Sequence, residues 1–518
     1  MNLFKSWRSD AQSSLVVFLV ALPLCLGIAL ASNAPLASGL FAGIIGGIVV
    51  GFFSGSNVSV SGPAAGLTVI VVNSITELGA FEAFSVAVFF SGLLQIIFGL
   101  LKGGIIGNYF PNSVIKGMLA AIGLILILKQ FPHAVGYDVD FMGDESFKQA
   151  DGGNTFTGIF SALNFLHGGA VLISSLSIIL MIGWEGLASK GHKFFKLFPG
   201  ALAAVFLGVG LNEIFKSMGS FLYLDTSHLV ALPFSGGFAE LMNNAKFPDW
   251  SVITNPAVYK VAFTIALVGS LESLLSIDAA DKLDKSGKIT SKNQELFAQG
   301  FANTLAGLVG ALPITAVIVR TSANVAAGAK SKLSAILHGL WLVLCVVLIP
   351  GLLNKIPLAA LAAVLILVGY KLTKPALIKS VYVRGWNQFI PFTVTIVAIL
   401  FTDLLMGIGI GMVVGLVFTL RANMRRAIVL VEDEESYLIR FYKDTTFLHK
   451  AHLIKTLDRI PNNSHVILDG GKVFLDEDII DLVEDFMRSS TKRNINITIE
   501  KSTLAINRLF KENAYGNN

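Results

Sequence analysis

Polar side chains that could bind ions lie inside otherwise apolar stretches of this sequence. Glu272 and Ser276 are four residues apart, so one helix would place both on the same face, and Thr315 lies in a later apolar stretch. A carboxylate at the centre of a membrane helix costs about 2.5–3.5 kcal/mol on insertion scales and is expected to be functional. Hard cations prefer oxygen ligands. We therefore expect a cation site, with sodium as one candidate ion, formed by Glu272, Ser276, Thr315 and backbone carbonyls near Ala311.

Each of these residues also has a structural interpretation. The Glu272 carboxylate would form a structural hydrogen bond that joins two helices. The hydroxyl groups of Ser276 and Thr315 would satisfy carbonyl groups of their own helices. The sequence leaves these alternatives open.

Two stretches, 59–69 and 311–324, have the same layout: an extended entry, a proline near the first helical turn, and a helix that starts inside the protein. A helix N-terminus has unpaired N–H groups and a partial charge of about +0.5. Two such ends facing one another at membrane depth would bind an anion. The expected contacts are the backbone N–H groups of Ala64, Ala65, Ile318 and Val319, the hydroxyl group of Thr68 and the side chain of Arg320.

Arg320 has two interpretations. It is either a fixed positive charge that raises the local anion concentration, or a structural partner of Glu272 or of a backbone carbonyl, because buried arginines are rarely unpaired. The small residues Ala64 and Ala65 either leave room for a compact oxyanion or allow close helix packing.

The composition indicates a polytopic α-helical membrane protein. Hydrophobic residues make up 54% of the chain and charged residues 14%, whereas soluble domains are about one quarter charged. Apolar runs long enough to cross a bilayer recur up to about residue 420. The predicted spans are 14–32, 36–53, 57–76, 82–101, 113–131, 168–187, 197–216, 257–277, 294–310, 312–328, 333–350, 356–371, 387–403 and 404–421.

The charged residues predict the orientation of these spans. Basic clusters at 190–196, 282–292 and 421–426 fall on one side of the membrane, and the acidic loop at 132–167 falls on the other. The positive-inside rule then places both termini in the cytoplasm. Fourteen spans divide into two sevens, with the proline-marked stretches third in each half. Such an inverted repeat places two broken helices face to face near the bilayer midplane, where transporters bind substrate.

The composition changes at about residue 435. Alternating patterns predict strands at 437–441, 466–469 and 494–500, and helices at 450–459 and 477–487. We expect a transmembrane domain at 1–430, a small cytoplasmic α/β domain at 431–512 and a disordered tail at 513–518.

Other chemistries find no support in the sequence. It has no phosphate-binding loop, no dinucleotide fingerprint and no nucleophile paired with a base, so we expect neither an enzyme nor an ATP-driven pump. The histidines show no metal-ligand spacing, and the two cysteines lie in separate apolar runs and predict no disulfide. The net charge of +5 does not indicate a nucleic-acid partner, because in a membrane protein the location of basic residues matters more than their sum.

The chain resembles the SulP family of anion transporters, also called the sulfate permeases, over nearly its full length. The matching segments are Val20–Leu24, Ser61–Pro63, Gly269–Leu275 with Ala280-Asp281, and Arg320–Asn324. The resemblance implies a core domain, about 14–101 and 257–350, that moves against a gate domain, about 113–216 and 356–421, in an elevator-like alternating-access cycle. It also implies a homodimer and a C-terminal STAS domain.

The resemblance further bears on coupling and regulation. In the family, the position of Glu272 lies at the substrate and coupling-ion site, so the resemblance makes Glu272, Ser276, Thr315 and Ala311 the expected coupling-ion residues. Sodium-coupled bicarbonate carriers of the family place an aspartate at this position, and the longer glutamate here argues against sodium coupling and makes proton coupling credible. The turn Asp469–Asp476 has no hydroxyl residue for a phosphorylation switch, which favours a dimer-interface or regulator-docking role for the STAS domain.

We therefore expect a secondary anion transporter of the inner or plasma membrane, coupled to sodium or protons. The entry patterns Ala21–Gly27 and Ser61–Gly66 are similar to those of family members that often accompany carbonic anhydrase, which gives bicarbonate a narrow preference over sulfate. The alternatives are a proton-coupled sulfate or dicarboxylate carrier, a passive anion channel, and an anion sensor that signals through the cytoplasmic domain.

Overall fold

The computed structural model describes residues 6–140, 142, 147, 153–192, 194–195, 198–232, 238–243, 245–284, 286–424, 427–433, 436–470 and 473–500. The chain forms two compact units, Met1–Val413 and Val414–Asn518. The predicted disordered tail at 513–518 lies outside the described residues, as do several charged residues of the predicted loops, namely Asp144, Glu145, Asp151, Lys193, Lys196, Lys285, Arg425 and Arg426.

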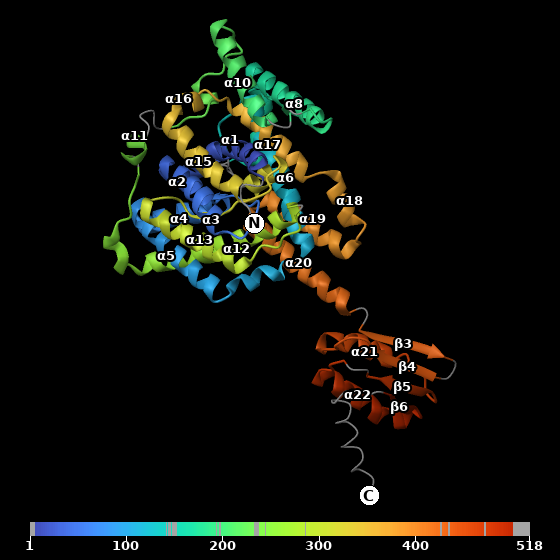
Figure 1. The fold of residues 1–518 in the computed structure, drawn as a ribbon. Helices are drawn as coiled ribbons and strands as arrows, with labels where there is room; N and C mark the ends of the chain where they lie inside the picture. Colours follow the sequence, from blue (N-terminus) through green and yellow to red (C-terminus); the bar gives the residue numbers. More distant parts are fainter. Residues whose placement is uncertain are drawn as a thin grey trace. The chain divides into compact units, whose positions relative to one another are not determined.

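The first unit is almost entirely helical (Figure 1). Its first half contains α1 (Trp7–Ala31), α2 (Leu36–Ile45), α3 (Gly51–Phe53), β1 (Ser61–Pro63), α4 (Thr68–Leu78), α5 (Phe81–Leu100), α6 (Asn112–Val135), α7 (Thr155–Asn164), α8 (Gly168–Ser189), α10 (Gly200–Ser217) and α11 (Phe238–Asn243). The second half contains α12 (Pro256–Leu283), α13 (Lys292–Val309), β2 (Ile314–Ala316), α14 (Ile318–Ala326), α15 (Leu333–Leu348), α16 (Pro350–Leu353), α17 (Leu358–Leu372), α18 (Pro375–Tyr382), α19 (Trp386–Phe401) and α20 (Leu404–Met424), which extends past the unit boundary.

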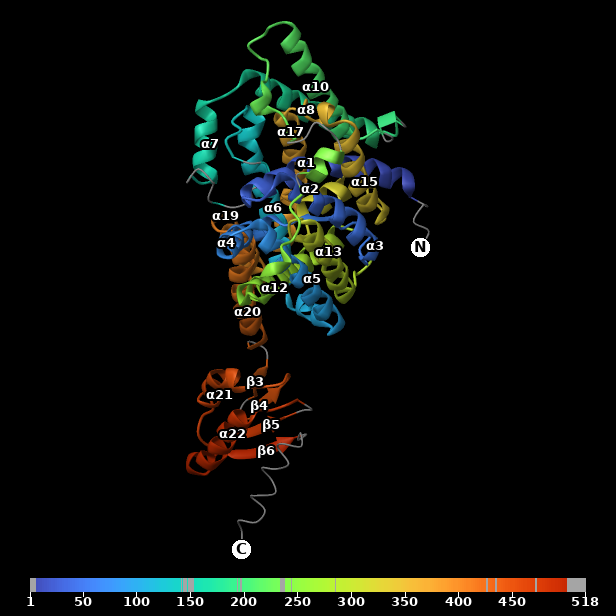
Figure 2. The same ribbon diagram turned by 90° about the vertical axis from the view of Figure 1, so that its left-hand side faces the viewer.

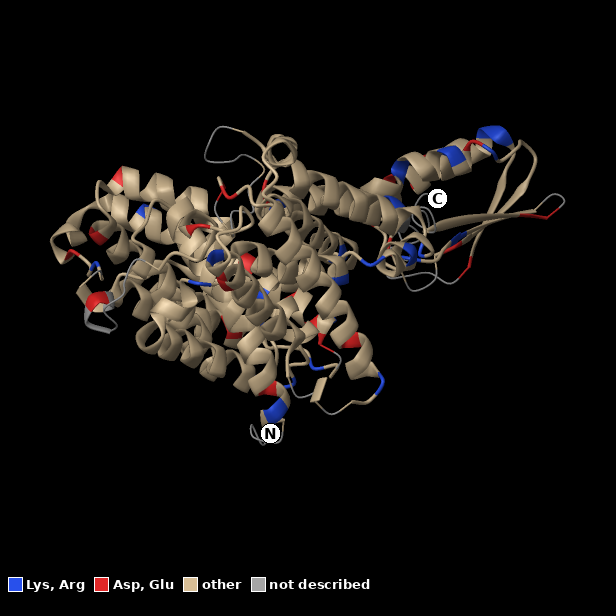
Figure 3. Ribbon diagram, turned by 90° about the horizontal axis from the view of Figure 1, so that it is seen from above, with Lys and Arg blue, Asp and Glu red and all other residues tan. Residues whose placement is uncertain are grey.

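Each of the fourteen predicted spans contains a helix. Among the described residues, nine helices are long and apolar enough to cross a membrane, and three shorter apolar helices accompany them. Charged residues are sparse along these helices (Figure 3). The helices α13 and α14 belong to neither group, so the count of fourteen crossings stays a prediction.

The helices gather into two groups (Figures 1 and 2). One group centres on α5, α12 and α13, whose core includes Phe84, Val261 and Ala302. The other joins α6, α8, α10, α17 and α19. Helix α1 contacts α2, α14 and α15 as well as α10 and α17, and therefore lies between the two groups.

The two prolines of the repeated layout stand in the entries and not in the first helical turns, which corrects the prediction. Pro63 ends β1, and Pro313 precedes β2, whose helix starts only at Ile318 and not at 312. The β-branched residues between Pro313 and Ile318 favour an extended backbone. The half-helices are correspondingly short.

Several elements of the first unit were not expected from the sequence. Helix α7 lies within the predicted acidic loop, where Asn154 and Thr157 form a capping box at its start. A π-helical turn, Gly46–Val50, interrupts the second predicted span. A Cβ atom on Gly46 would lie 2.5 Å from the carbonyl oxygen of Ser61, so this turn packs directly on β1.

The second unit has a four-stranded sheet in the order β3-β4-β5-β6. Its elements are β3 (Ile428–Asp433), β4 (Ser436–Phe441), α21 (Lys450–Leu457), β5 (His465–Asp469), α22 (Glu477–Ser490) and β6 (Asn496–Glu500). Strand β3 runs antiparallel to β4, and the other pairs are parallel. The sequence did not predict β3, which starts before the proposed boundary at 431. Apolar residues of the sheet and of both helices form one core, including Ile439, Leu468 and Ile479.

Candidate anion and coupling-ion site

The two extended entries of the half-helices lie side by side in the interior of the first unit. Strands β1 and β2 pair antiparallel, with Gly62 opposite Thr315 and Pro63 opposite Ile314. All the residues of both strands are buried. Because the strands run in opposite directions, α4 and α14 leave the pair from opposite ends. Non-helical backbone is tolerated at membrane depth only where protein surrounds it, as it does here.

Further hydrogen bonds hold each entry to the other. The N–H group of Val317 donates to the carbonyl of Val60 at 3.0 Å, and the N–H group of Val60 donates to the Thr321 hydroxyl at 3.1 Å. The N–H group of Ala64 donates to the carbonyl of Pro313 at 3.3 Å. The predicted anion donor Ala64 is therefore engaged within the entry pair in this conformation.

Buried amides on α5 and α13 satisfy the remaining backbone groups of β2. The Asn303 side chain accepts from the N–H group of Ile314 at 2.7 Å and donates to its carbonyl at 2.9 Å. It also donates to Gln95 at 2.7 Å, and Gln95 donates to the Ser270 hydroxyl at 3.3 Å. Gln299 donates to the Ser61 hydroxyl at 2.8 Å. A buried amide between two half-helix entries fixes their positions.

The role of these amide side chains was not predicted from the sequence. The signal was present: Gln95 interrupts the apolar run of its span, and Gln299 and Asn303 are four residues apart and share a helix face. Ser273, one residue after Glu272, was also missed; its hydroxyl accepts from the N–H group of Ala316 at 3.3 Å.

The carboxylate of Glu272 lies at the start of α4. A 3₁₀ turn, Ala65–Leu67, opens this half-helix, and a Cβ atom on Gly66 would lie 3.2 Å from Cδ and from both carboxylate oxygens of Glu272. The partial positive charge of a helix N-terminus favours a negative group at this position. Gly66 is thus the point where α12 meets the half-helix.

Glu272 and Ser276 line one small cavity of about 10 Å³. Gly66 lines it as well, together with Met118 of α6 and Leu404, Leu405 and Ile408 of α20. The structure therefore brings together two of the four predicted coupling-ion residues, at a place where both helix groups meet.

The other two predicted coupling-ion residues do not line this cavity. Thr315 is fully buried opposite Gly62, and its hydroxyl has no partner among the described residues. Ala311 follows the end of α13, where Gly310 has a φ of +69° and a Cβ atom would lie 1.8 Å from the carbonyl oxygen of Lys246. Only glycine fits this turn, which leads the chain into β2.

Arg320 is fully buried on the first turn of α14. Its Nη2 donates to Cys25 Sγ of α1 at 3.3 Å, and its Nη1 would lie 2.0 Å from a Cβ atom on Gly62. In the described part of the chain, Nε and Nη1 have no hydrogen-bond partner. The guanidinium group thus lies against the backbone of β1.

The remaining predicted anion contacts sit at the two helix starts. Ala65 begins the 3₁₀ turn before α4, and Ile318 and Val319 begin α14, where helical N–H groups have no intrahelical partner. Thr68 donates its hydroxyl to the Ala65 carbonyl at 2.7 Å. None of these residues lines the small cavity beside Glu272.

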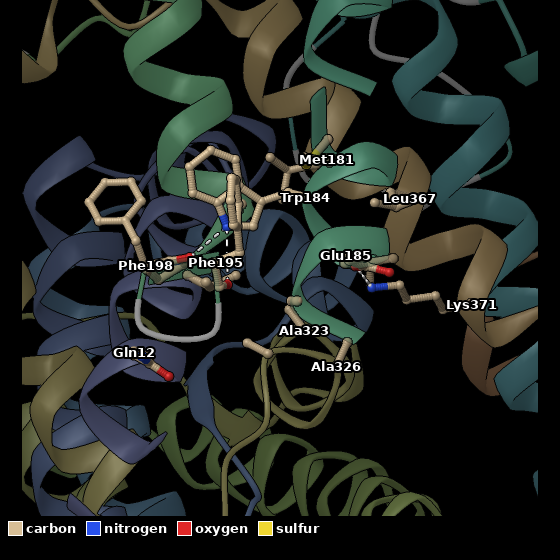
Figure 4. Close-up of a pocket in the computed structure, with 18 residues that line it drawn as sticks. Gln12, Met181, Trp184, Glu185, Phe195, Phe198, Ala323, Ala326, Leu367 and Lys371 are labelled. Atoms are coloured by element: carbon tan, nitrogen blue, oxygen red, sulfur yellow. Dashed lines mark hydrogen bonds and ion pairs between the residues drawn. The ribbon is translucent and has the colours of Figure 1, made fainter. Parts of the chain in front are cut away.

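A larger cavity of about 300 Å³ lies between α1 and α14 on one side and α8 and α17 on the other. Figure 4 shows Trp184 directed toward Phe195 and Phe198, and its indole N–H donates to the carbonyls of both residues. Glu185 and Lys371 form an ion pair at the same cavity. The cavity separates the two helix groups where the sequence predicts the cytoplasmic side.

Comparison with known proteins identifies the family. Residues 7–398 match the model of the sulfate permease family. The chain belongs to this family. It is 28% identical over 421 residues to the putative sulfate transporter YvdB of Bacillus subtilis, which covers 81% of this chain and 74% of that protein. It is 27% identical over 432 residues to the bicarbonate transporter BicA of Picosynechococcus, covering 80% and 71%.

Two solved transporter structures are similar to this chain. The chain aligns with SLC26A9 at a TM-score of 0.67 and 16% identity, covering 98% of this chain and 86% of that chain. It aligns with the transmembrane domain of a cyanobacterium bicarbonate transporter BicA at a TM-score of 0.53 and 22% identity, covering 80% and 98%. At these identities the likeness shows the fold alone, that of a polytopic helical transporter.

Proposed function

We propose that this chain carries a small inorganic anion, bicarbonate or sulfate, across the inner or plasma membrane by secondary active transport. The observation that carries the proposal is the guanidinium group of Arg320, which is fully buried and has only the Cys25 thiol as a hydrogen-bond partner among the described residues. A buried charge without a counter-charge costs several kcal/mol. An anion bound at the starts of α4 and α14 would compensate this charge.

The choice between anions rests on the family and on the donors. Relatives are named as carriers of sulfate and of bicarbonate. Backbone N–H groups of Ala65, Ile318 and Val319 would bind any compact oxyanion. We place bicarbonate first because the entry segments Ala21–Gly27 and Ser61–Gly66 are similar to those of family members that often accompany carbonic anhydrase.

Coupling centres on Glu272. Its carboxylate lies at the start of α4, where a transported anion is also expected, so the two negative charges repel one another. Protonation of Glu272 removes the repulsion, which favours proton symport. Sodium coupling requires instead that Ser276, Thr315 and the Ala311 carbonyl converge with Glu272 on one ion.

The two helix groups correspond to the moving parts that we propose. A core domain of α1–α5 and α12–α15 moves against a gate domain of α6–α8, α10 and α17–α20 in an elevator-type cycle. We further propose a homodimer, and a STAS domain in the second unit that docks a cytoplasmic regulator.

Uptake into proteoliposomes tests the function. The purified chain is reconstituted, and uptake of radiolabelled bicarbonate and sulfate is followed with an inward sodium gradient, an inward proton gradient, or neither. Labelled CO2 crosses lipid unaided and becomes bicarbonate in an alkaline interior, so each uptake is compared with that of protein-free liposomes. A coupled carrier accumulates one anion above this level only with its own gradient, of sodium or of protons. Equilibration without accumulation identifies a passive channel. Saturable anion binding without any uptake identifies a sensor, and both outcomes overturn the proposal.

A further inference from the structure

A cluster of titratable side chains lies away from the site described above. The carboxylate of Asp138, in the segment after α6, accepts hydrogen bonds from Nδ1 of His133 and from Nδ1 of His228, each at 2.6 Å. The Asp138 side chain is 5% exposed, and that of His133 is 3% exposed. One buried carboxylate thus joins α6 to a segment 90 residues further along the chain.

The segment that carries His228 is firmly held. A 3₁₀ turn, Thr226–His228, follows a double hydrogen bond between Asn212 of α10 and the backbone of Leu224. After the turn, the N–H group of Val230 donates to the carbonyl of Ile356 at 3.0 Å, just before α17. Hydrogen bonds to α10 and to the residue before α17 therefore fix the position of the segment that carries His228.

The segment that carries Asp138 lies against α1. A Cβ atom on Gly27 would lie 1.6 Å from the carbonyl oxygen of Met142, so the backbones touch there. Asp140 pairs with Lys129 of α6 at 3.0 Å. A cavity of about 170 Å³ lies between this segment and α1, and its lining includes Leu26, Gly27, Asp138 and Asp140. The segment thus links α1, of the proposed core, to the proposed gate.

We propose that His133, Asp138 and His228 form a proton-sensitive lock that holds the segment of Tyr137–Asp140 and Met142 across α1, so that opening at this face depends on pH. The sequence predicts that this face lies outside the cell. When α1 moves relative to α6 and α17, the segment must release either Gly27 or the two histidines. The strength of the lock therefore sets the rate of opening.

The charged groups around the lock determine whether it becomes weaker or stronger as the pH rises. The hydrogen bond to Asp138, opposed by burial, raises the pKa of His228 above its ordinary value. Burial acts to raise the pKa of Asp138, but the hydrogen bonds from His133 and His228 hold it below its ordinary value. His167, whose ring lies 5.3 Å from that of His228, and Asp225 also face the cluster. Burial and then the charge of His228 lower the pKa of His167.

The lock is strongest between the lowered pKa of Asp138 and the raised pKa of His228, where the two groups carry opposite charges. As the pH rises through the pKa of His228, the ion pair becomes a neutral hydrogen bond, which is about half as strong. We expect opening to become about five- to tenfold faster across this range.

Two measurements test the lock. The first is the rate of sulfate uptake into proteoliposomes at equal pH on both sides. Sulfate is the substrate of choice because it stays a dianion between about pH 6 and pH 9. The readout is the uptake rate of each variant divided by that of the parent chain at the same pH, which removes the pH dependence of the coupling step. This ratio is expected to be about five to ten for His228→Gln at pH 6 and to fall toward one as the pH rises. His192→Gln, an exposed histidine away from the cluster, should keep a ratio of one.

The second measurement does not need transport, so a failure of the proposed function is distinguishable. Leu26→Cys places a thiol in the cavity, and its labelling by a membrane-impermeant maleimide is compared at each pH with and without His228→Gln. The thiolate fraction changes equally in both, and the parent chain corrects for its native cysteines. We expect labelling at pH 6 to be several-fold faster with His228→Gln and equal at pH 9. Equal labelling at pH 6, or an uptake ratio of His228→Gln to the parent chain that does not change with pH, overturns the lock.

Discussion

Gly66→Ala is the substitution that most finely probes the contact between α12 and α4. The added Cβ atom would lie 3.2 Å from Cδ and from both oxygens of the Glu272 carboxylate. The favourable separation for such contacts is about 3.5–4.0 Å. The carboxylate must therefore move by a few tenths of an ångström away from the helix end that stabilises it.

This movement weakens the site, because the carboxylate leaves the helix end and the contact becomes overpacked. Overpacking of a buried contact costs about 1–3 kcal/mol. A loss near the lower end of this range reduces the apparent anion affinity about 5- to 30-fold. Gly66→Val, whose side chain is larger and β-branched, should abolish transport. We expect the Gly66→Ala chain to remain folded, because the atoms that must move are the flexible end of the Glu272 side chain.

Initial uptake rates at increasing anion concentration and at several pH values measure the effect. The control is Gly183→Ala on α8, where an added Cβ atom meets no atom within 4 Å. The control should transport as the parent chain does. A Gly66→Ala chain with the parent KM and pH dependence would refute the assignment of this contact to the anion and coupling site.

Two further substitutions separate binding from support. Arg320→Gln should raise the KM for the anion about tenfold or more while leaving the melting temperature equal or higher, because it removes a buried charge without a counter-charge among the described residues; an unchanged KM with a lower melting temperature would assign Arg320 a structural role. Asn303→Ala should lower the free energy of unfolding by about 2–4 kcal/mol, since both backbone groups of Ile314 lose their partner. Thermal unfolding in detergent measures this loss, with Thr304→Ala as the control, because the Thr304 hydroxyl only satisfies its own helix; equal losses in both variants would contradict the support role of Asn303.

Local sequence patterns predicted the helices and strands whose formation depends mainly on interactions between residues close in sequence. The apolar run at 82–101 predicted α5, and the sequence around Glu477 predicted α22. The extended entries were also expected, since Pro63 and Pro313 are incompatible with a helix interior. Strand β3 was missed because Ile428–Val431 reads as a continuation of the apolar run before it.

The pairing of distant residues was beyond the reach of these patterns. The register of Gly62 with Thr315 joins positions about 250 residues apart, and it decides that the Ala64 N–H group is occupied. The direction of Arg320 toward Cys25 depends on how α1 packs on α14. The same holds for Asp138, which the sequence placed only in an acidic loop and the structure places between two histidines.

The most direct test of the central claim is accumulation of labelled bicarbonate and sulfate under an inward proton gradient by three chains: the parent, Glu272→Gln and Glu77→Gln. Glu77 is an exposed residue paired with Lys260 and serves as the matched control. The account predicts that the parent and Glu77→Gln accumulate one anion above the level reached in protein-free liposomes and that Glu272→Gln does not exceed this level. Accumulation by Glu272→Gln at the parent level would contradict the account.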